Sequence, residues 1–231
     1  MQVTPRVHQV DGLGMGRAYI LLGDGVTVVD SSMPGHGKQI LEAIVRLGKR
    51  PEDVRRVVVT HHHVDHVGSA AELIEATGAE LYAHEADVPY VRGEQVQEAN
   101  APAFVRALMR RLGPKPPRGS EVHHALRDGD TVPIGGSLRV IHAPGHTMGS
   151  VALLWEEESV LFTGDALSHL IRISLPVGIF TEDMDLAKRS AAKLASLRFE
   201  TACFGHGAPI VGGASERIAR AASRWAAPTS A

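Results

Sequence analysis

The sequence predicts a layered α+β fold, with helices on the outside and β-sheets inside. Along its 231 residues, the predicted elements occur about twice in the order strands, helix, strands, helix. Elements in this order bury their apolar faces by stacking in layers. Histidine, aspartate and glycine also gather directly after several predicted strands, which places a candidate site at strand ends.

The first elements are a hairpin, a helix and a buried strand. Residues 18–22 and 26–30 are short apolar runs around Gly23-Asp24-Gly25, a pattern typical of a β-hairpin. Apolar residues then recur at helical spacing over 40–47, and a glycine and a proline end that helix. Residues 57–60 are mostly β-branched and predict a buried strand.

The next elements lead up to the middle of the chain. Apolar residues from 67 to 74 follow helical spacing, and Gly78 is a plausible C-cap. Glu80–Ala83 is a predicted strand, and 99–112 is a predicted helix with apolar residues on one face, namely Phe104, Val105, Leu108, Met109 and Leu112. Residues 113–117 break that helix with glycine and prolines, but are too few for a domain linker, so we expect 1–231 to form one domain.

The last third of the chain repeats the pattern of strands followed by a helix. Apolar runs predict strands at 138–142, 151–155, 159–163 and 201–204. Helices are expected at 185–197 and 215–226, with Ser215 as the N-cap of the last one.

The composition excludes several functional classes. The net charge is −2 and the pI is about 6.7, so no basic field is available for nucleic acid. No apolar run approaches the roughly 18–20 residues that span a bilayer, and the first ten residues do not resemble a secretory signal. The single cysteine, Cys203, lies in an apolar strand and is expected in the core. These features favour a cytoplasmic protein without membrane or nucleic-acid partners.

Residues 61–66 read His-His-His-Val-Asp-His and contain the strongest functional signal. Read as H-x-H-x-D-H, the run offers four potential metal ligands within six positions: His61, His63, Asp65 and His66. Neutral imidazole and carboxylate are ligand types that zinc and similar transition metals prefer. His62 is expected to point away from the others and not to bind metal.

Three later segments each place one further ligand type after a predicted strand. They contain His146, Asp165 and His206, each beside a glycine that lets the backbone turn sharply. Seven ligands are too many for one tetrahedral metal, but they suit two metals that share a bridging group.

The chain resembles the metallo-β-lactamase-fold hydrolases over nearly its whole length. It has the motifs of that family in the same order: H-x-H-x-D-H, then a histidine, a Gly-Asp and a last histidine. The resemblance implies a four-layer αββα sandwich with the site at one edge of the sheets. It assigns His61, His63 and His146 to a first metal and Asp65, His66 and His206 to a second, with Asp165 bridging both. The usual nucleophile of the family is a metal-bridging hydroxide.

The resemblance also suggests supporting residues. Zinc is the expected ion, with iron or manganese as alternatives. Asp65 is the candidate proton donor to the leaving group. Asp30 stands where the family often has an aspartate that supports the metal loop by hydrogen bonds. His169 and Arg172 lie shortly after Asp165, where related enzymes often place a substrate-contacting group, and His169 is the stronger candidate.

Some branches of the family fit the sequence poorly. Diiron reductases usually carry glutamate in place of His63, and β-lactamases typically lack the aspartate at Asp165. Glutathione thioesterases usually add a helical domain after the last histidine, whereas 25 residues follow His206 here. Lactonases share all seven ligands but usually have a tyrosine near Ser168.

Residues 85–125 are additional to a minimal version of this fold. Their amphipathic helix suggests either a lid over the site or a contact in a homodimer. A lid lined by Phe104, Leu108 and Met109 would favour an apolar or acyl substrate, unless these residues face the core.

The sequence therefore predicts a hydrolase with two divalent metal ions that cleaves an ester, lactone or thioester of a small molecule. The alternative is a persulfide dioxygenase with one iron on the same scaffold. A structural zinc module fits poorly, because such sites are commonly rich in cysteine.

Overall fold

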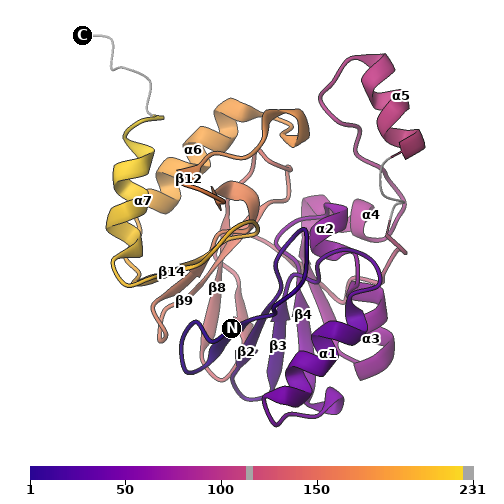
Figure 1. Cartoon of the computed structure of the whole chain (residues 1–231), viewed down its shortest axis with the longest axis vertical. Helices are drawn as coiled ribbons and strands as arrows, with labels where there is room; N and C mark the ends of the chain where they lie inside the picture. Colours follow the sequence, from indigo (N-terminus) through magenta and orange to yellow (C-terminus); the bar gives the residue numbers. More distant parts are fainter. Residues whose placement is uncertain (113–116, 226–231) are drawn as a thin grey trace.

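The computed structural model, which describes residues 1–112 and 117–225, contains two facing six-stranded β-sheets with helices on their outer faces. Figure 1 shows the sheets in the centre, helices α1 and α3 outside one sheet, and α6 and α7 outside the other. The predicted αββα order of layers is confirmed.

The first sheet has a parallel half and an antiparallel half. Its strands lie in the order β1 (Val7–Gln9), β2 (Tyr19–Leu22), β3 (Val26–Val29), β4 (Val54–Val58), β5 (Glu80–His84) and β6 (His124–Leu126). Strands β3 to β6 are parallel, and the predicted hairpin is the antiparallel pair β2–β3. Helices α1 (Gly37–Arg46) and α3 (Ala70–Thr77) cover this sheet.

The second sheet is mainly antiparallel. Its strands lie in the order β14 (Ile210–Val211), β13 (Thr201–Cys203), β10 (Val160–Phe162), β9 (Val151–Trp155), β8 (Ser137–His142) and β7 (Thr131–Pro133). Only β10 and β13 are parallel neighbours. Helices α6 (Met184–Ala195) and α7 (Ala214–Ala222) cover its outer face.

Shorter elements connect the layers. They are α2 (Val64–Val67), α4 (Val88–Val91), α5 (Ala103–Leu112), the two-stranded pair β11 (Ser168–His169) and β12 (Ile173–Ser174), and the 3-10 turns η1 (Pro51–Asp53), η2 (Glu85–Asp87), η3 (Gly164–Ala166) and η4 (Gly178–Phe180).

Three separate apolar clusters hold the four layers together. One lies between α1, α3 and the first sheet, one between the two sheets, and one between the second sheet and α6 and α7. Strand β9 explains the pattern, because its side chains alternate between the middle cluster and the outer one. Both faces are covered, so this strand is apolar throughout.

The strand directions bring the ligand-bearing loops to one edge. Strands β8 and β10 are both antiparallel to β9, and β13 is parallel to β10, so these three strands end at the same edge of their sheet. In the first sheet, β3, β4 and β5 also end together. The backbone N–H of Val151 donates to the carbonyl of Thr60 at 2.9 Å and ties the two sheets together near this edge.

The structure corrects several predicted boundaries. The helix expected over 67–74 is split into α2 and α3 because the Ser69 hydroxyl, between them, bonds the backbone of Met33 and His36. The N-cap of α7 is Gly213, with φ 62°, and not Ser215. Glu200 instead accepts hydrogen bonds from the backbone at the start of that helix.

The segment 85–125 is only partly an insertion, because residues 124–126 form β6 and extend the first sheet. Helix α5 begins at Ala103, later than predicted, and stands away from the sheets in Figure 1. Phe104 and Leu108 do not face the core, since 75% and 55% of their surfaces are exposed.

A few predictions concern positions outside the described residues. They are the loop at 113–116, the end of the last helix at 226, and the side chain of Met109. Within the described ranges, no helix combines the length and apolar character needed to cross a bilayer.

Candidate metal centre

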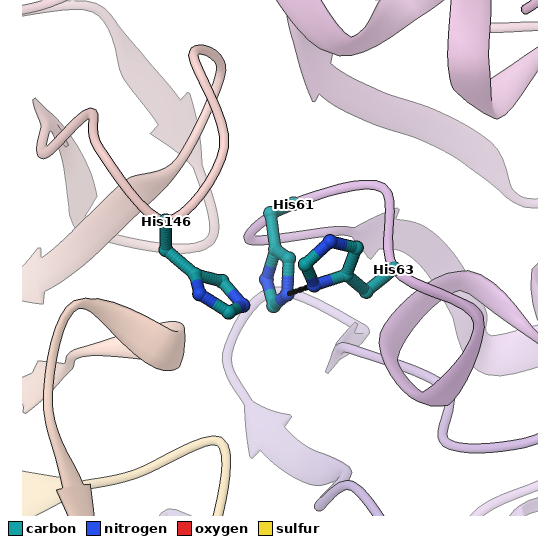
Figure 2. A group of neighbouring side chains, drawn as sticks. All are labelled: His61, His63 and His146. Carbon is teal, nitrogen blue, oxygen red and sulfur yellow. Dashed lines mark hydrogen bonds between the residues drawn. The ribbon is translucent and has the colours of Figure 1, made fainter. Parts of the chain in front are cut away.

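The first group of predicted ligands converges from both sheets. His61 and His63 follow β4, and His146 follows β8. Figure 2 shows the three imidazoles pointing toward one another, with His146 opposite the other two. Nε2 of His61 lies 3.1 Å from Nδ1 of His63, and all three ligand nitrogens lie within 4.8 Å of one another.

The second group is formed by Asp65, His66 and His206. Asp65 and His66 lie in the short helix α2, whereas the sequence predicted a loop for them, and His206 follows β13. Nε2 of His206 lies 3.1 Å from Oδ2 of Asp65 and 3.4 Å from Nε2 of His66.

Asp165 lies between the two groups. Its Oδ1 is 3.4 Å from Nε2 of His66, and its Oδ2 is 3.2 Å from Nε2 of His206 and 3.5 Å from Nε2 of His146. One carboxylate therefore reaches ligand atoms of both groups, which is the position a bridging ligand requires.

The donor set fits divalent metal ions. Zinc bonds of about 2.0–2.1 Å in tetrahedral geometry place ligand atoms roughly 3.3–3.4 Å apart, close to the separations observed here. Within the described residues, Nε2 of His146 and Oδ1 of Asp165 are buried without a hydrogen-bond partner. Buried polar atoms are rarely left unsatisfied, so these atoms are suited to bind an ion.

Asp30 orients two of the histidines. Its Oδ2 accepts a hydrogen bond from Nδ1 of His66 at 2.9 Å and one from the hydroxyl of Thr60 at 2.8 Å. The Thr60 oxygen lies 3.1 Å from Nδ1 of His61 and can accept its proton, because the hydroxyl hydrogen is directed at Asp30. In their neutral, metal-binding form both imidazoles thus carry the proton on Nδ1 and leave Nε2 for a metal, as second-shell partners commonly arrange. Asp30 has φ 58°, an uncommon conformation for a residue other than glycine.

Thr181 has the same role for His146. Its hydroxyl donates to the carbonyl of Val177 at 2.9 Å, so its oxygen can accept a proton from Nδ1 of His146 at 3.2 Å. Nε2 of His146 is then left to face Asp165 and the other ligands.

Asp87 joins the two ligand loops. Its Oδ2 accepts from the backbone N–H of His62 at 2.9 Å and from the hydroxyl of Thr147 at 3.0 Å, and its Oδ1 accepts from the N–H of Gly149 at 2.9 Å. His62 belongs to neither ligand group; its ring stacks on Tyr90 at 4.2 Å, and its Nδ1 lies 3.0 Å from Oδ2 of Asp87.

The first group favours neutral imidazoles. Burial is the main cause, and it lowers the pKa of His61 well below its usual range. Burial and neighbouring histidines lower the pKa of His63 to about 3. Burial lowers the pKa of His146 to about 4, although Asp165 opposes the shift. Neutral imidazole is the form that binds a metal.

In the second group, carboxylates stabilise the protonated form of the histidines. Burial opposes a charge on His66, but the carboxylates of Asp165, Asp30 and Asp65 raise its pKa to about 9. Burial likewise opposes a charge on His206, but hydrogen bonds to Asp165 and Asp65 raise its pKa to about 10. Burial would raise the pKa of Asp165, yet the two histidines lower it to about 2.

The remaining candidates lie outside the ligand groups. His169 is partly exposed, and its Nδ1 donates to the carbonyl of Ala208 at 2.8 Å, so Nε2 is its acceptor nitrogen. Arg172 is exposed. Cys203 is buried in the core, as predicted, and burial raises the pKa of its thiol.

Comparison with known proteins agrees with this geometry. The family model of the metallo-beta-lactamase superfamily matches residues 11–206. The chain is a member of the metallo-beta-lactamase superfamily. The matched range includes all seven predicted ligands and ends at the last of them, His206.

Two curated relatives of this superfamily member are similar in sequence. The probable metallo-hydrolase YflN of Bacillus subtilis is 31% identical over 202 residues, covering 80% of this chain and 76% of the relative. A hydroxyacylglutathione hydrolase of Gloeobacter violaceus is 31% identical over 163 residues, but the match covers 70% of this chain and 52% of the relative.

A solved structure supports the fold of this superfamily member. A metallo-beta-lactamase family protein of Thermus thermophilus superposes with a TM-score of 0.72 at 25% identity, covering 97% of this chain and 80% of the other.

The structure brings together all seven predicted ligands. It adds four residues that the sequence did not suggest: Thr60, Asp87, Thr181 and Gln97, whose Oε1 lies 2.6 Å from Nε2 of His63. Thr60 directly precedes the motif and could have been suspected from that position. The other three come from connecting segments with no recognisable pattern, and only the folded chain places them beside the histidines.

Proposed function

We propose that this superfamily member is a hydrolase with two metal ions, zinc being the expected metal, that cleaves an ester, lactone or thioester bond of a small molecule. The observation that carries the proposal is the position of Asp165, whose two carboxylate oxygens reach His66, His146 and His206. A carboxylate shared in this way supports two metal ions rather than one.

The relatives support this class of reaction. One is named a probable metallo-hydrolase and another a hydroxyacylglutathione hydrolase. Acylglutathiones are thioesters, so the second relative favours an acyl bond as the target. The match covers about half of that relative, so the proposal extends to the bond type and not to glutathione.

The two groups of ligands would each hold one metal ion. When bound, two divalent ions supply hydroxide at neutral pH and polarise the oxygen of the bond to be cleaved. One ion would be held by His61, His63 and His146. The other ion would be held by Asp65, His66 and His206, and Asp165 would bind both ions.

Two further residues would act on the substrate. Asp65 is the proposed proton carrier: although burial would raise the pKa of its carboxyl, His66 and His206 hold it well below its ordinary value, so the carboxylate would accept the proton of the attacking water and then donate it to the leaving group. His169 is the proposed substrate contact, because Nε2 remains its acceptor nitrogen and its backbone N–H is bonded to the carbonyl of His206 at 2.9 Å.

Metal analysis combined with a substrate panel tests the proposal. Zinc-loaded protein is assayed on p-nitrophenyl esters, lactones, thioesters and phosphodiesters, with and without a chelator. We expect two metals per chain and hydrolysis of acyl substrates that the chelator abolishes. Fewer than one metal per chain, or full activity after chelation, would contradict the proposal. One iron, together with oxygen consumption on a persulfide, would favour a dioxygenase.

The variant Asp165→Ala tests the shared ligand. We expect it to lose one of the two metals and at least ~100-fold in rate, since bridging groups position the nucleophile. Asp185→Ala is the matched control, because Asp185 lies on α6 with 79% of its side chain exposed. Unchanged turnover in folded Asp165→Ala would show that the assignment is wrong.

A further inference from the structure

We propose that Gln97 is a positioning residue for His63, and that it couples metal binding at the first group to the seating of residues 92–102 against the site. We call residues 92–102 the strap. The inference rests on the proposed two-metal function, and it assigns a role to a side chain that is neither a ligand nor part of either sheet.

Gln97 is placed to receive the imidazole proton of His63 and lies beside His62 as well. Its Oε1 lies 2.6 Å from Nε2 of His63 and 2.8 Å from Nε2 of His62. An amide oxygen has two lone pairs, so it can accept the proton of Nε2 of His63, and also that of Nε2 of His62 when His62 is protonated on both nitrogens, since Nδ1 of His62 faces Oδ2 of Asp87 at 3.0 Å. The adjacent residues 96 and 98 are exposed, whereas Gln97 is half-buried. The strap therefore turns this one side chain toward the histidines.

The contact selects the tautomer that a metal needs. His63 directs Nδ1 toward His61, at 3.1 Å, and Nε2 toward Gln97. A neutral imidazole that ligates through Nδ1 must carry its proton on Nε2. The amide oxygen of Gln97 accepts that proton, so ligation and the contact with the strap require the same form of His63.

A second contact ties the strap to the opposite side of the site. The backbone N–H of Asn100 donates to the carbonyl of Ile179 at 2.9 Å. Ile179 belongs to η4, which ends one residue before Thr181, the acceptor for Nδ1 of His146. The strap thus bonds directly to one ligand of the first group and to the turn that orients another.

The other contacts of the strap are with its own flanking elements: the backbone of residues 92–95 bonds to residues 88–90, and Glu98 pairs with Arg106 of α5 at 3.0 Å. Residues 92–96, 98 and 100 are exposed, and Val96 is 72% exposed. Segments with few buried apolar contacts open at low free-energy cost. We call the conformation in which Gln97 contacts His63 the seated state. A hydrogen bond that strengthens when His63 binds a metal can therefore shift the strap toward the seated state.

The coupling must act in both directions. If metal binding stabilises the seated strap, then the seated strap raises metal affinity by the same factor. Removal of a partner that orients a ligating histidine typically lowers metal affinity roughly 10- to 100-fold, and we expect an effect in that range.

Two variants and a matched control test the proposal. Gln97→Met keeps the length of the side chain without the acceptor, whereas Gln97→Glu keeps the acceptor. Gln95→Met makes the same change at an exposed position of the same strap. Zinc affinity is measured by competition with a chelator, and amide hydrogen exchange of the strap is compared in zinc-loaded and zinc-free protein.

We expect Gln97→Met to bind at least one zinc equivalent 10-fold or more weakly and to lose the zinc-dependent protection of the strap. Gln97→Glu and Gln95→Met should retain both properties. Wild-type affinity and protection in Gln97→Met would overturn the proposal, and so would equal losses in Gln95→Met. Neither measurement uses a substrate, so the coupling can hold even if hydrolysis is not found. A wild-type protein that binds no zinc would overturn both proposals.

Discussion

Asp87 should be the most damaging single position outside the ligands, and Asp87→Ala tests this. Asp87 is 1% exposed; its carboxylate accepts hydrogen bonds from the backbone of His62, the hydroxyl of Thr147 and the backbone of Gly149, and its Oδ2 lies 3.0 Å from Nδ1 of His62. These donors belong to the loop after β4 and the loop after β8. The substitution would separate the loops that hold the first group of ligands.

The expected loss of stability follows from the donors left without an acceptor. Each buried donor that loses its partner costs about 1–3 kcal/mol, and the breaking of a buried charged network typically costs about 3–5 kcal/mol in all. Water that enters the vacated space would offset part of the free-energy cost of the unpaired donors. We therefore expect Asp87→Ala to lower the free energy of unfolding of the metal-free protein by ~3–5 kcal/mol.

The effect should depend on pH with a definite sign. Burial would raise the pKa of Asp87, but hydrogen bonds to His62 and Thr147 hold it below its ordinary value of 3.8. A carboxyl whose pKa is lower in the folded state stabilises the fold above its unfolded pKa, and this contribution is lost as the pH falls through the folded value. The difference between wild type and Asp87→Ala should be constant from about pH 5 to 8 and narrow below about pH 4.

Urea unfolding of metal-free protein, followed by circular dichroism at several pH values, measures this difference. Asp130→Ala is the control, because Asp130 is exposed and its carboxylate accepts only a local hydrogen bond from Arg127. A loss below about 1 kcal/mol in Asp87→Ala, or a difference that widens toward acid, would refute the reasoning.

Two other substitutions probe the packing and orientation of the site, and the reactivity of Cys203 probes the apolar cluster between the sheets. Gly205→Ala would direct a methyl group into Oδ1 of Asp165, so we expect loss of one metal per chain in elemental analysis while the far-ultraviolet circular dichroism is retained. Thr181→Val removes the acceptor for Nδ1 of His146, and zinc affinity measured by chelator competition should fall about 10-fold. Cys203 is buried with a raised pKa, so Ellman's reagent should not react with it until urea unfolds the chain, and rapid reaction in the native protein would contradict the packing described above.

Much of the fold could be predicted because the strongly patterned elements lie where local preference and layering agree. The hairpin β2–β3 and the helix α1 are examples. The short edge strands β1, β7 and β14 have two or three residues each and no distinctive pattern. Their existence depends on a neighbouring strand that offers free backbone groups, which no local window of sequence reveals.

The candidate ligands could be selected from the sequence for a different reason. Their chemistry is unusual for a strand end, so each residue type signals a role even before the fold is known. The orienting residues carry no such signal. Thr181 and Gln97 are ordinary polar residues in connecting segments, and their importance arises because distant parts of the chain bring them within hydrogen-bond distance of His146 and His63.

The site lies at the boundary between the two sheets, and this location explains how its ligands are held. His61 and His63 extend from one sheet, while His146, Asp165 and His206 extend from the other. A relative shift of the sheets would therefore separate the ligands. The middle apolar cluster resists such a shift over the length of the strands. At the edge itself, where that cluster ends, polar links take over: Thr60 to Val151, Asp87 to both ligand loops, and the strap from His63 to the turn before Thr181. The apolar layers thus set the distance between the sheets, and the polar links set the positions of the individual ligand atoms.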